Sequence, residues 1–89
     1  MNSNADLWWV YLLECRGGRF YIGVSNNVVA RFLAHARGKG AMFTRLNPPE
    51  RIIAARPVGT KVEAMRAEYA LKRTRRAAKF AWAEQWAWR

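Results

Sequence analysis

Seven consecutive apolar residues near the start of the chain constrain its fold more than any other feature. Leu7–Leu13 (LWWVYLL) contains no polar break. Its length and its bulky residues are typical of a central strand that is covered on both faces. The run is much shorter than the roughly 18 apolar residues that a membrane-spanning helix requires, so no membrane span is predicted.

Two further strands are predicted. Arg16–Arg19 (RGGR) is a turn signal, and Phe20–Val24 (FYIGV) reads as a short strand, so it should form a hairpin with the apolar run. Arg51–Arg56 (RIIAAR) reads as a third strand between Pro49 and Pro57. The sheet is therefore expected to be small, three-stranded and mainly antiparallel.

The rest of the chain is predicted to be largely helical. Asn and Ser residues suited to capping precede a helix over Val28–Arg37, and two more helices are expected over Lys61–Arg73 and Arg75–Trp86. Ala41–Leu46 could be a helical turn or a loop. Because strands come first and helices mix in later, the fold class is α+β, with a sheet flanked by helices. We expect a single domain over 1–89, with a core of about 7–80, a polar lead over 1–6 and an aromatic C-terminal helix over 75–89.

The first predicted helix has an apolar face and, on one flank of it, two side chains that could take part in a reaction. Its apolar residues gather on one face, which predicts the buried side: Val28, Val29, Phe32, Leu33 and Ala36. Arg31 and His35 are four residues apart, so they lie together on one flank of that face.

The charge balance points to a polyanionic partner. Sixteen Lys and Arg residues face six acids, giving a net charge of +10, and twelve of the sixteen are Arg, whose planar guanidinium suits phosphate. Nucleic acid is the expected partner, and a merely soluble basic surface is the alternative. One Cys and one His rule out an intrachain disulfide and a zinc site of the Cys and His type. With no signal peptide visible, a cytoplasmic protein is expected.

Five residues that could act together occur in a distinctive order along the chain. Tyr11 lies in Trp9-Val10-Tyr11 and Tyr21 opens Tyr21-Ile22-Gly23. The other three are Arg31, His35 four residues later, and Glu68 in a later helix. This order resembles that of the GIY-YIG nuclease family, which is named after the two tripeptides. The stretch from Arg37-Gly38-Lys39-Gly40-Ala41 to Thr44-Arg45 also resembles small bacterial members. The resemblance covers residues 8 to about 79.

The resemblance implies a metal-dependent endonuclease that hydrolyses DNA, with a role in repair or recombination. It implies that Glu68 binds a single Mg²⁺ or Mn²⁺ and that Arg31 binds the scissile phosphate. Tyr11 and Tyr21 would position or deprotonate water, with His35 as hydrogen-bond partner or proton carrier. The sequence departs from the family in three places: Trp9-Val10 replaces Gly-Ile, Val24-Ser25 stands where many members have Lys, and no Asn follows Asn47.

Each of these residues also has a simpler interpretation. The tyrosines could be packing residues, and Glu68 could form a weak surface ion pair with Lys72, four residues later. The basic residues beyond the five could form a solvated surface, although we favour contact with the DNA backbone. They are Arg37, Lys39, Arg45, Lys72, Arg73, Arg75, Arg76 and Lys79. The last five should continue the helix of Glu68 toward the substrate.

The hairpin sets a geometric condition on the two-tyrosine site. A two-residue loop at Gly17-Gly18 would pair Glu14 with Tyr21 and place Tyr11 on the opposite face. The tyrosines can share a face only if the loop has an odd number of residues or a bulge intervenes. Gly17 or Gly18 can supply the left-handed residue of a three-residue loop. We therefore predict an odd loop or a bulge.

Three functions remain open on the sequence alone. The first is the endonuclease, and the second is a nucleic-acid-binding module of the same fold with weak or no cleavage. The third, a structural basic protein such as a ribosomal component, explains the charge but not the five residues. The form of the DNA, the need for a protein partner and the presence of a homodimer are not determined by the sequence.

Overall fold

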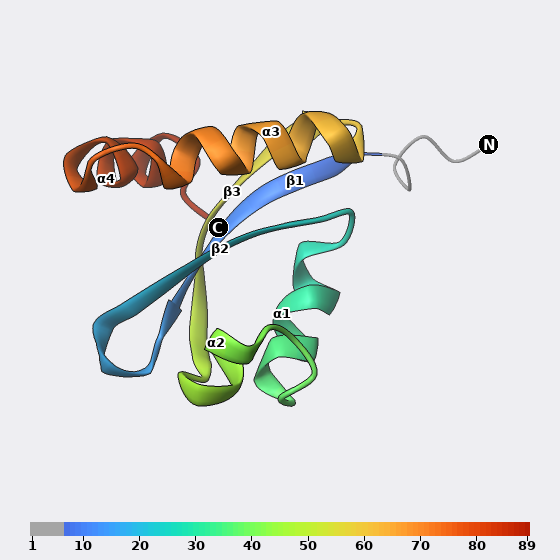
Figure 1. Cartoon of the computed structure of the whole chain (residues 1–89), viewed down its shortest axis with the longest axis vertical. Helices are drawn as coiled ribbons and strands as arrows, with labels where there is room; N and C mark the ends of the chain where they lie inside the picture. Colours follow the sequence, from blue (N-terminus) through green and yellow to red (C-terminus); the bar gives the residue numbers. More distant parts are fainter. Residues whose placement is uncertain (1–6) are drawn as a thin grey trace.

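A three-stranded antiparallel sheet forms the centre of the molecule (Figure 1). The computed structural model describes residues 7–89, and the predicted polar lead over 1–6 lies outside the described residues. β1 (Trp8–Cys15) lies between β2 (Arg19–Ser25) and β3 (Pro49–Gly59), giving the order β2-β1-β3. The α+β class and the antiparallel sheet are confirmed, and the apolar run is the central strand. The helices are α1 (Val28–Ala36), α2 (Met42–Leu46), α3 (Lys61–Lys72) and α4 (Arg76–Gln85).

The hairpin meets the condition that the sequence set. Cys15 pairs with Arg19, so the loop is the three-residue 3₁₀ turn Arg16–Gly18. Gly17 and Gly18 both adopt positive φ, 77° and 72°, which a glycine allows without strain. In the resulting register Tyr21 pairs with Leu13, two residues from Tyr11. Because alternate residues share a face, Tyr11 and Tyr21 lie on the same side of the sheet.

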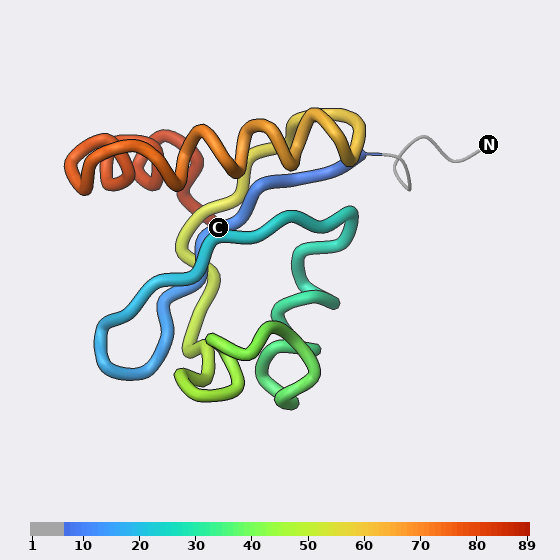
Figure 2. The backbone as a smooth tube through the Cα atoms, in the orientation of Figure 1, coloured from blue at the N-terminus to red at the C-terminus, as the bar shows by residue number. Residues whose placement is uncertain are grey.

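The helices cover opposite faces of the sheet (Figures 1 and 2). α3 and α4 pack on one face against a cluster of buried residues, Val10, Leu12, Ile22, Ala54 and Leu71, which Trp82 and Trp86 extend. α1 and α2 lie on the other face, where the buried cluster is Tyr11, Leu13, Cys15, Val28 and Ala55. β1 contributes to both clusters, so it is covered on both faces, as predicted.

The predicted buried side of α1 is wrong in part. Val29 and Leu33 are 48% and 43% exposed, whereas His35 is 1% exposed. Val28 is buried and Phe32 packs against the same cluster. An apolar count misses this face because a histidine can be buried when both its ring nitrogens have hydrogen-bond partners, as those of His35 do.

The two separate helices predicted on either side of residue 74 are confirmed, whereas the expectation that the five basic residues continue the helix of Glu68 is wrong. α3 ends at Lys72 and α4 begins at Arg76. The Thr74 hydroxyl donates to the carbonyl of Leu71 at 2.6 Å. The Lys79 ammonium donates to the carbonyls of Lys72 and Thr74. Side-chain donors thus satisfy carbonyl groups that the end of a helix leaves unpaired, and they fix the turn between the two helices.

β3 is longer than predicted and lies at an edge of the sheet. It extends through Pro57, which an edge strand tolerates because one side of the strand needs no ladder partner. A segment after α4 pairs with part of this edge: the Ala55 amide donates to Trp86 O at 3.0 Å, and the Trp88 amide donates to Ile53 O at 2.9 Å. Among residues 7–89, no helix is long and apolar enough to cross a membrane.

Candidate active site

A buried hydrogen-bonded chain joins β1 to α1 and α2. The hydroxyl of Tyr11 lies 2.8 Å from Nε2 of His35. The other ring nitrogen, Nδ1, lies 2.7 Å from Oγ1 of Thr44. All three residues are 1% exposed. Tyr11 comes from the central strand, His35 from the last turn of α1 and Thr44 from α2.

The bonding pattern assigns the protons along this chain. The Thr44 hydroxyl donates its single hydrogen to the carbonyl of Ala41 at 2.9 Å. Its oxygen therefore accepts from His35, which places a hydrogen on Nδ1. In the neutral ring Nε2 is then an acceptor, and Tyr11 donates its hydroxyl hydrogen to it. The result is a directed chain from Tyr11 through His35 and Thr44 to a backbone carbonyl.

Two glycines, Gly23 and Gly40, leave the space that the side chains of Tyr11 and His35 occupy. Gly23 pairs with Tyr11 across the hairpin, and a Cβ on it would lie 2.5 Å from the tyrosine Oη. A Cβ on Gly40 would overlap Nδ1 of His35. Neither φ is in the left-handed region. The requirement for glycine at these positions is therefore one of space, set by the Tyr11 and His35 side chains.

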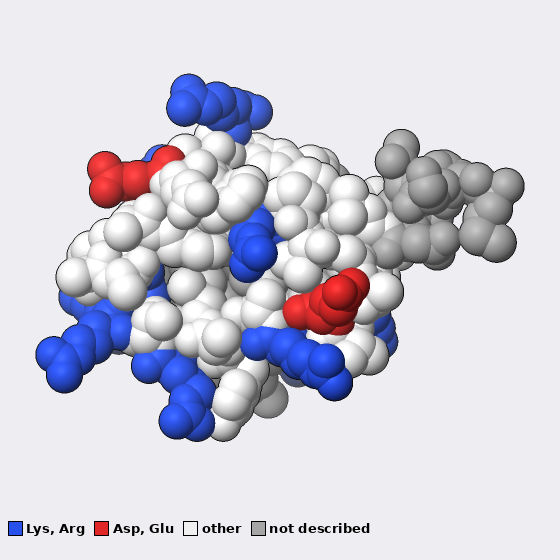
Figure 3. Space-filling model, turned by 90° about the horizontal axis from the view of Figure 1, so that it is seen from above, with Lys and Arg blue, Asp and Glu red and all other residues white. Residues whose placement is uncertain are grey.

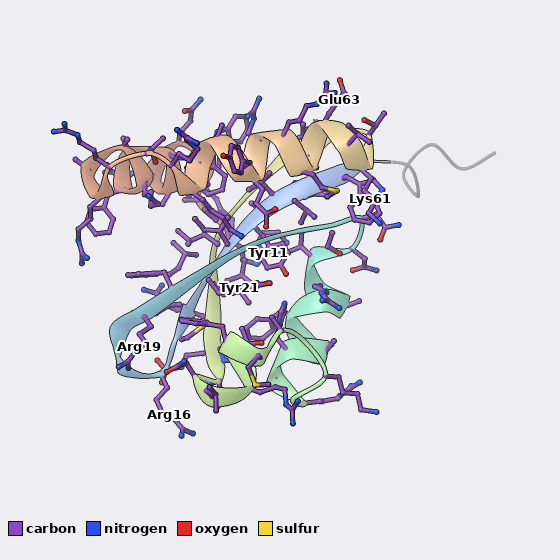
Figure 4. The ribbon with its side chains drawn as sticks, in the orientation of Figure 1. Tyr11, Arg16, Arg19, Tyr21, Lys61 and Glu63 are labelled. Carbon is purple, nitrogen blue, oxygen red and sulfur yellow. The ribbon has the colours of Figure 1, made fainter. Side chains whose placement is uncertain are left out.

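Tyr21 is the more exposed of the two tyrosines, which lie close to each other at the sheet (Figure 4). Its ring centroid is 6.3 Å from that of Tyr11 and 5.0 Å from that of His35. The ring of Phe43 from α2 stacks on it, with centroids 6.0 Å apart and an interplanar angle of 24°. Tyr21 is half-buried, whereas Tyr11 is sealed. A molecule approaching the site meets Tyr21 before Tyr11.

Burial is the largest influence on the pKa values of Tyr11 and His35 in this hydrogen-bonded chain. It raises the pKa of Tyr11 to about 12, with further contributions from Tyr21 and, more weakly, Glu68, while Arg31 opposes the rise. Burial and then the positive charge of Arg31 lower the pKa of His35. Both residues are therefore neutral at pH 7, which matches the proton assignment above. The influence of Arg31 on both pKa values places its guanidinium next to the chain, although the residue itself is exposed.

Glu68, the predicted metal ligand, lies on α3. Its side chain is 20% exposed, and its oxygen Oε2 lies 3.3 Å from the Lys72 ammonium. The simpler interpretation of an ion pair with Lys72 is thus realised in the structure. The carboxylate also contributes to the pKa of Tyr11, so it lies within electrostatic range of the tyrosine hydroxyl.

The carboxylate of Glu68 could help to bind one Mg²⁺ or Mn²⁺ ion, but the described residues do not form a complete metal site. Among the described residues, no group of three or more His, Cys, Asp or Glu side chains could hold a metal ion. Mg²⁺ commonly binds one or two carboxylates and completes its octahedron with water and substrate phosphate oxygens. Glu68 alone could supply that carboxylate.

The basic residues form several separate groups around the surface. Arg37, Lys39 and Arg45 are exposed near α1 and α2. Arg73 lies over the ring of Tyr69 at 5.3 Å and Arg76 over that of Phe80 at 5.0 Å, while Lys72 and Lys79 are engaged with Glu68 and with carbonyls. Figure 3 looks down on α3 and α4 and shows Lys and Arg side chains scattered over this face, including near its middle, with acidic side chains among them. Arg75, just before α4, is exposed as well.

The structure brings four of the five predicted residues around one point and adds others. Tyr11, Tyr21 and His35 are in contact, and Arg31 is beside them. Nothing in the sequence pattern indicates the role of Thr44 or the space that Gly40 leaves. Both lie in the stretch from Arg37 to Arg45, whose one signal is its resemblance to small bacterial members of the family. Thr44 carries no chemical signal by itself, because its hydrogen-bond partner His35 is 9 residues away.

A family model for the GIY-YIG catalytic domain matches residues 7–81. The chain belongs to the GIY-YIG family. It is 51% identical to a UPF0213 protein of Xanthomonas axonopodis pv. citri over 84% of this chain and 74% of that protein. It is 45% identical to a UPF0213 protein of Cupriavidus pinatubonensis, over 83% of this chain and 82% of the relative.

A solved structure agrees with the GIY-YIG fold. The solution NMR structure of a UPF0213 protein from Bacillus halodurans is 41% identical, with a TM-score of 0.52. The match covers 84% of this chain and 80% of the other. These relatives carry names that state no activity, so the family indicates a nuclease-type domain and nucleic-acid binding and goes no further.

Proposed function

We propose that this GIY-YIG domain is a metal-dependent endonuclease that hydrolyses phosphodiester bonds in DNA, in repair or recombination. The observation that supports this best is the buried Tyr11–His35–Thr44 chain beside Arg31. A hydrogen-bonded histidine can stabilise a core, but this one also presents its unprotonated Nε2 to a tyrosine hydroxyl beside an exposed arginine. A reaction that must remove a proton from water gains from this arrangement.

Each residue of the site has a separate role in the proposed reaction. Arg31 is exposed and has no carboxylate partner among the ion pairs of residues 7–89, so its guanidinium is available to a phosphate. Tyr21, the more accessible tyrosine, orients the attacking water. Tyr11 accepts a proton at Oη as its own hydrogen moves to Nε2 of His35, and the Nδ1 hydrogen stays bonded to Thr44. The imidazolium so formed keeps a hydrogen-bond partner at both nitrogens.

Glu68 would hold a single Mg²⁺ or Mn²⁺, which supplies charge stabilisation at the phosphate oxygens. To do so the carboxylate must be released from Lys72. The ammonium then becomes free to contact the backbone of the substrate. The exposed Arg37, Lys39 and Arg45 extend the contact on the α1 and α2 side.

Cleavage of labelled single-stranded, duplex and branched DNA with Mg²⁺, Mn²⁺ or EDTA tests the proposal. Metal-dependent cutting should be lost in Glu68→Gln and reduced in Tyr21→Phe and His35→Gln. Glu84→Gln, an exposed carboxylate on α4, is the matched control and should cut like the wild type. Cleavage that persists in Glu68→Gln would refute the assignment of the metal ligand.

A non-catalytic nucleic-acid-binding module is the second candidate, and one observation favours it. The Glu68–Lys72 ion pair neutralises the carboxylate that the reaction needs. If the wild type binds DNA in a salt-dependent way but cuts none of the three substrates with either metal, the binding module is the correct function.

A further inference from the structure

A groove lies on the face of the sheet opposite the tyrosines. It has a volume of about 490 Å³ and lies between the hairpin and α4. Its apolar floor and walls come from β1, β2, β3 and α4: Leu12, Phe20, Ile22, Ile53, Phe80 and Ala83. We call it the α4 groove. Its volume lies within the range of pockets that hold small molecules.

Two aromatic rings stand in the α4 groove with much of their surface uncovered. Phe20 is 38% exposed and Phe80 is 46% exposed. Their rings meet edge to face, with centroids 6.5 Å apart and an interplanar angle of 78°. Such rings offer a flat partner a stacking surface that the protein leaves in contact with water.

The rim of the α4 groove is positively charged. Arg51, Arg76 and Lys79 line it together with one acid, Glu14. The carboxylate of Glu14 is paired with Arg51 at 2.6 Å, so these two charges offset each other and the excess positive charge comes from Arg76 and Lys79. The guanidinium of Arg76 lies 5.0 Å above the Phe80 ring, which holds it over the aromatic surface. An occupant with both a flat apolar part and negative charge is therefore complementary to the groove.

We propose that the α4 groove binds an unpaired base of single-stranded DNA, with the adjoining phosphate on Arg76. The inference rests on the proposed function and specifies its substrate as DNA with an unpaired segment. Bases in a duplex are stacked on their neighbours and cannot enter a groove of this size without leaving the stack. Aromatic side chains beside cations are the usual surface for unpaired bases.

The path from the tyrosine site to the α4 groove crosses the outer edge of the sheet. Tyr21 and Phe20 are consecutive residues of β2, an edge strand, and their side chains point to opposite faces. An extended strand that passes over this edge meets both. Arg16 and Arg19 project from the hairpin loop at the same end of the sheet, where phosphates would pass (Figure 4).

A protein segment is the competing occupant, and the charge disfavours it. The chain carries a net charge of +10, and the groove keeps an excess of positive charge at its rim. A polyanion gains from both, whereas a protein helix would need a matching row of acids and several apolar anchors along its length. The experiment below separates the two.

The test measures the affinity of labelled oligo-dT and of a blunt duplex of equal length by fluorescence anisotropy, in EDTA so that no cleavage occurs. Phe80→Ala and Phe20→Ala should weaken oligo-dT binding by about 5- to 100-fold, the loss of one stacked base, and change duplex binding little. Leu46→Ala, an exposed apolar residue on α2 that is 71% exposed, is the control and should bind like the wild type. Phe80→Leu keeps apolar bulk without the ring and guards against a folding defect.

A second readout locates the base. Titration of oligo-dT should shift the methyl NMR signals of Ile22 and Ile53, which line the groove, and Phe80→Leu should remove those shifts. Unchanged oligo-dT affinity in both Phe variants, with no shift at these methyls, overturns the inference even if the wild type cuts DNA. If the Phe variants lose affinity but no substrate is cut, the nuclease proposal fails and the base site stands.

Discussion

A single histidine makes the pH dependence of stability easy to assign. The chain contains one His, and His35 is 1% exposed. Burial and the charge of Arg31 lower its pKa from the ordinary 6.5. As the pH falls through about 6.5, the unfolded chain takes up a proton at His35 while the folded chain does not. The unfolded state then binds more protons, so the free energy of unfolding decreases as the pH falls.

The expected slope has an upper limit set by one proton. One pKa unit corresponds to about 1.4 kcal/mol, so the free energy of unfolding should fall by up to about 1.4 kcal/mol per pH unit below pH 6.5, until the pH reaches the folded-state pKa. The capping box lowers the pKa of Glu63 from 4.5, so that carboxylate acts at lower pH and leaves this window clear.

Urea unfolding followed by tryptophan fluorescence at several values between pH 5 and pH 7.5 measures the slope. His35→Asn should flatten the dependence, whatever its effect on stability at pH 7.5. A wild-type protein whose stability is constant over this range would refute the burial of a neutral His35. An equal slope in His35→Asn would refute its assignment to that residue.

Three further predictions concern packing and the buried chain. Thr44→Val leaves the Nδ1 hydrogen of His35 without an acceptor and should lower the free energy of unfolding by about 1–3 kcal/mol in thermal or urea unfolding, whereas Thr44→Ser should lose less. Gly23→Ala should displace the Tyr11 hydroxyl, and ¹⁵N NMR should then detect a changed His35 tautomer population; an unaltered His35 spectrum would contradict the steric reasoning. Leu13→Ala, at 0% exposure, should cost about 2–5 kcal/mol in urea unfolding, and a loss below 1 kcal/mol would show that the site is not tightly packed.

The sequence predicted the sheet well because its signals are local. The apolar run fixed the central strand, and the parity of the hairpin loop followed from two glycines and the need to bring two tyrosines together. The bounds of β3 were too short because Pro57 reads as a strand end, yet an edge strand accepts it. The two helices after β3 were predicted as separate, with their break at Thr74, as the structure has them. The expectation that the basic residues continue the helix of Glu68 was wrong, because side-chain bonds from Thr74 and Lys79 to carbonyls fix the turn between the helices.

The candidate site was predicted as a list of residues but not as an arrangement. Family resemblance supplied Tyr11 and His35, whereas the direction of the hydrogen bonds depends on Thr44 and on the carbonyl of Ala41. A sequence also does not show which positions must be small: Gly40 is required because a Cβ there would overlap the ring of His35. The α4 groove escaped prediction because its residues come from four separate elements.

The short pairing of the segment after α4 with β3 bears on self-association. Exposed sheet edges recruit strands from other molecules and lead to aggregation. Here the amide of Ala55 and the carbonyl of Ile53 are already occupied by residues of the same chain. At the other edge, β2 begins with the charged Arg19. The edge of β3 is thus partly occupied by an intramolecular strand contact, and the edge of β2 begins with a charged residue, two features that disfavour edge-to-edge pairing of sheets.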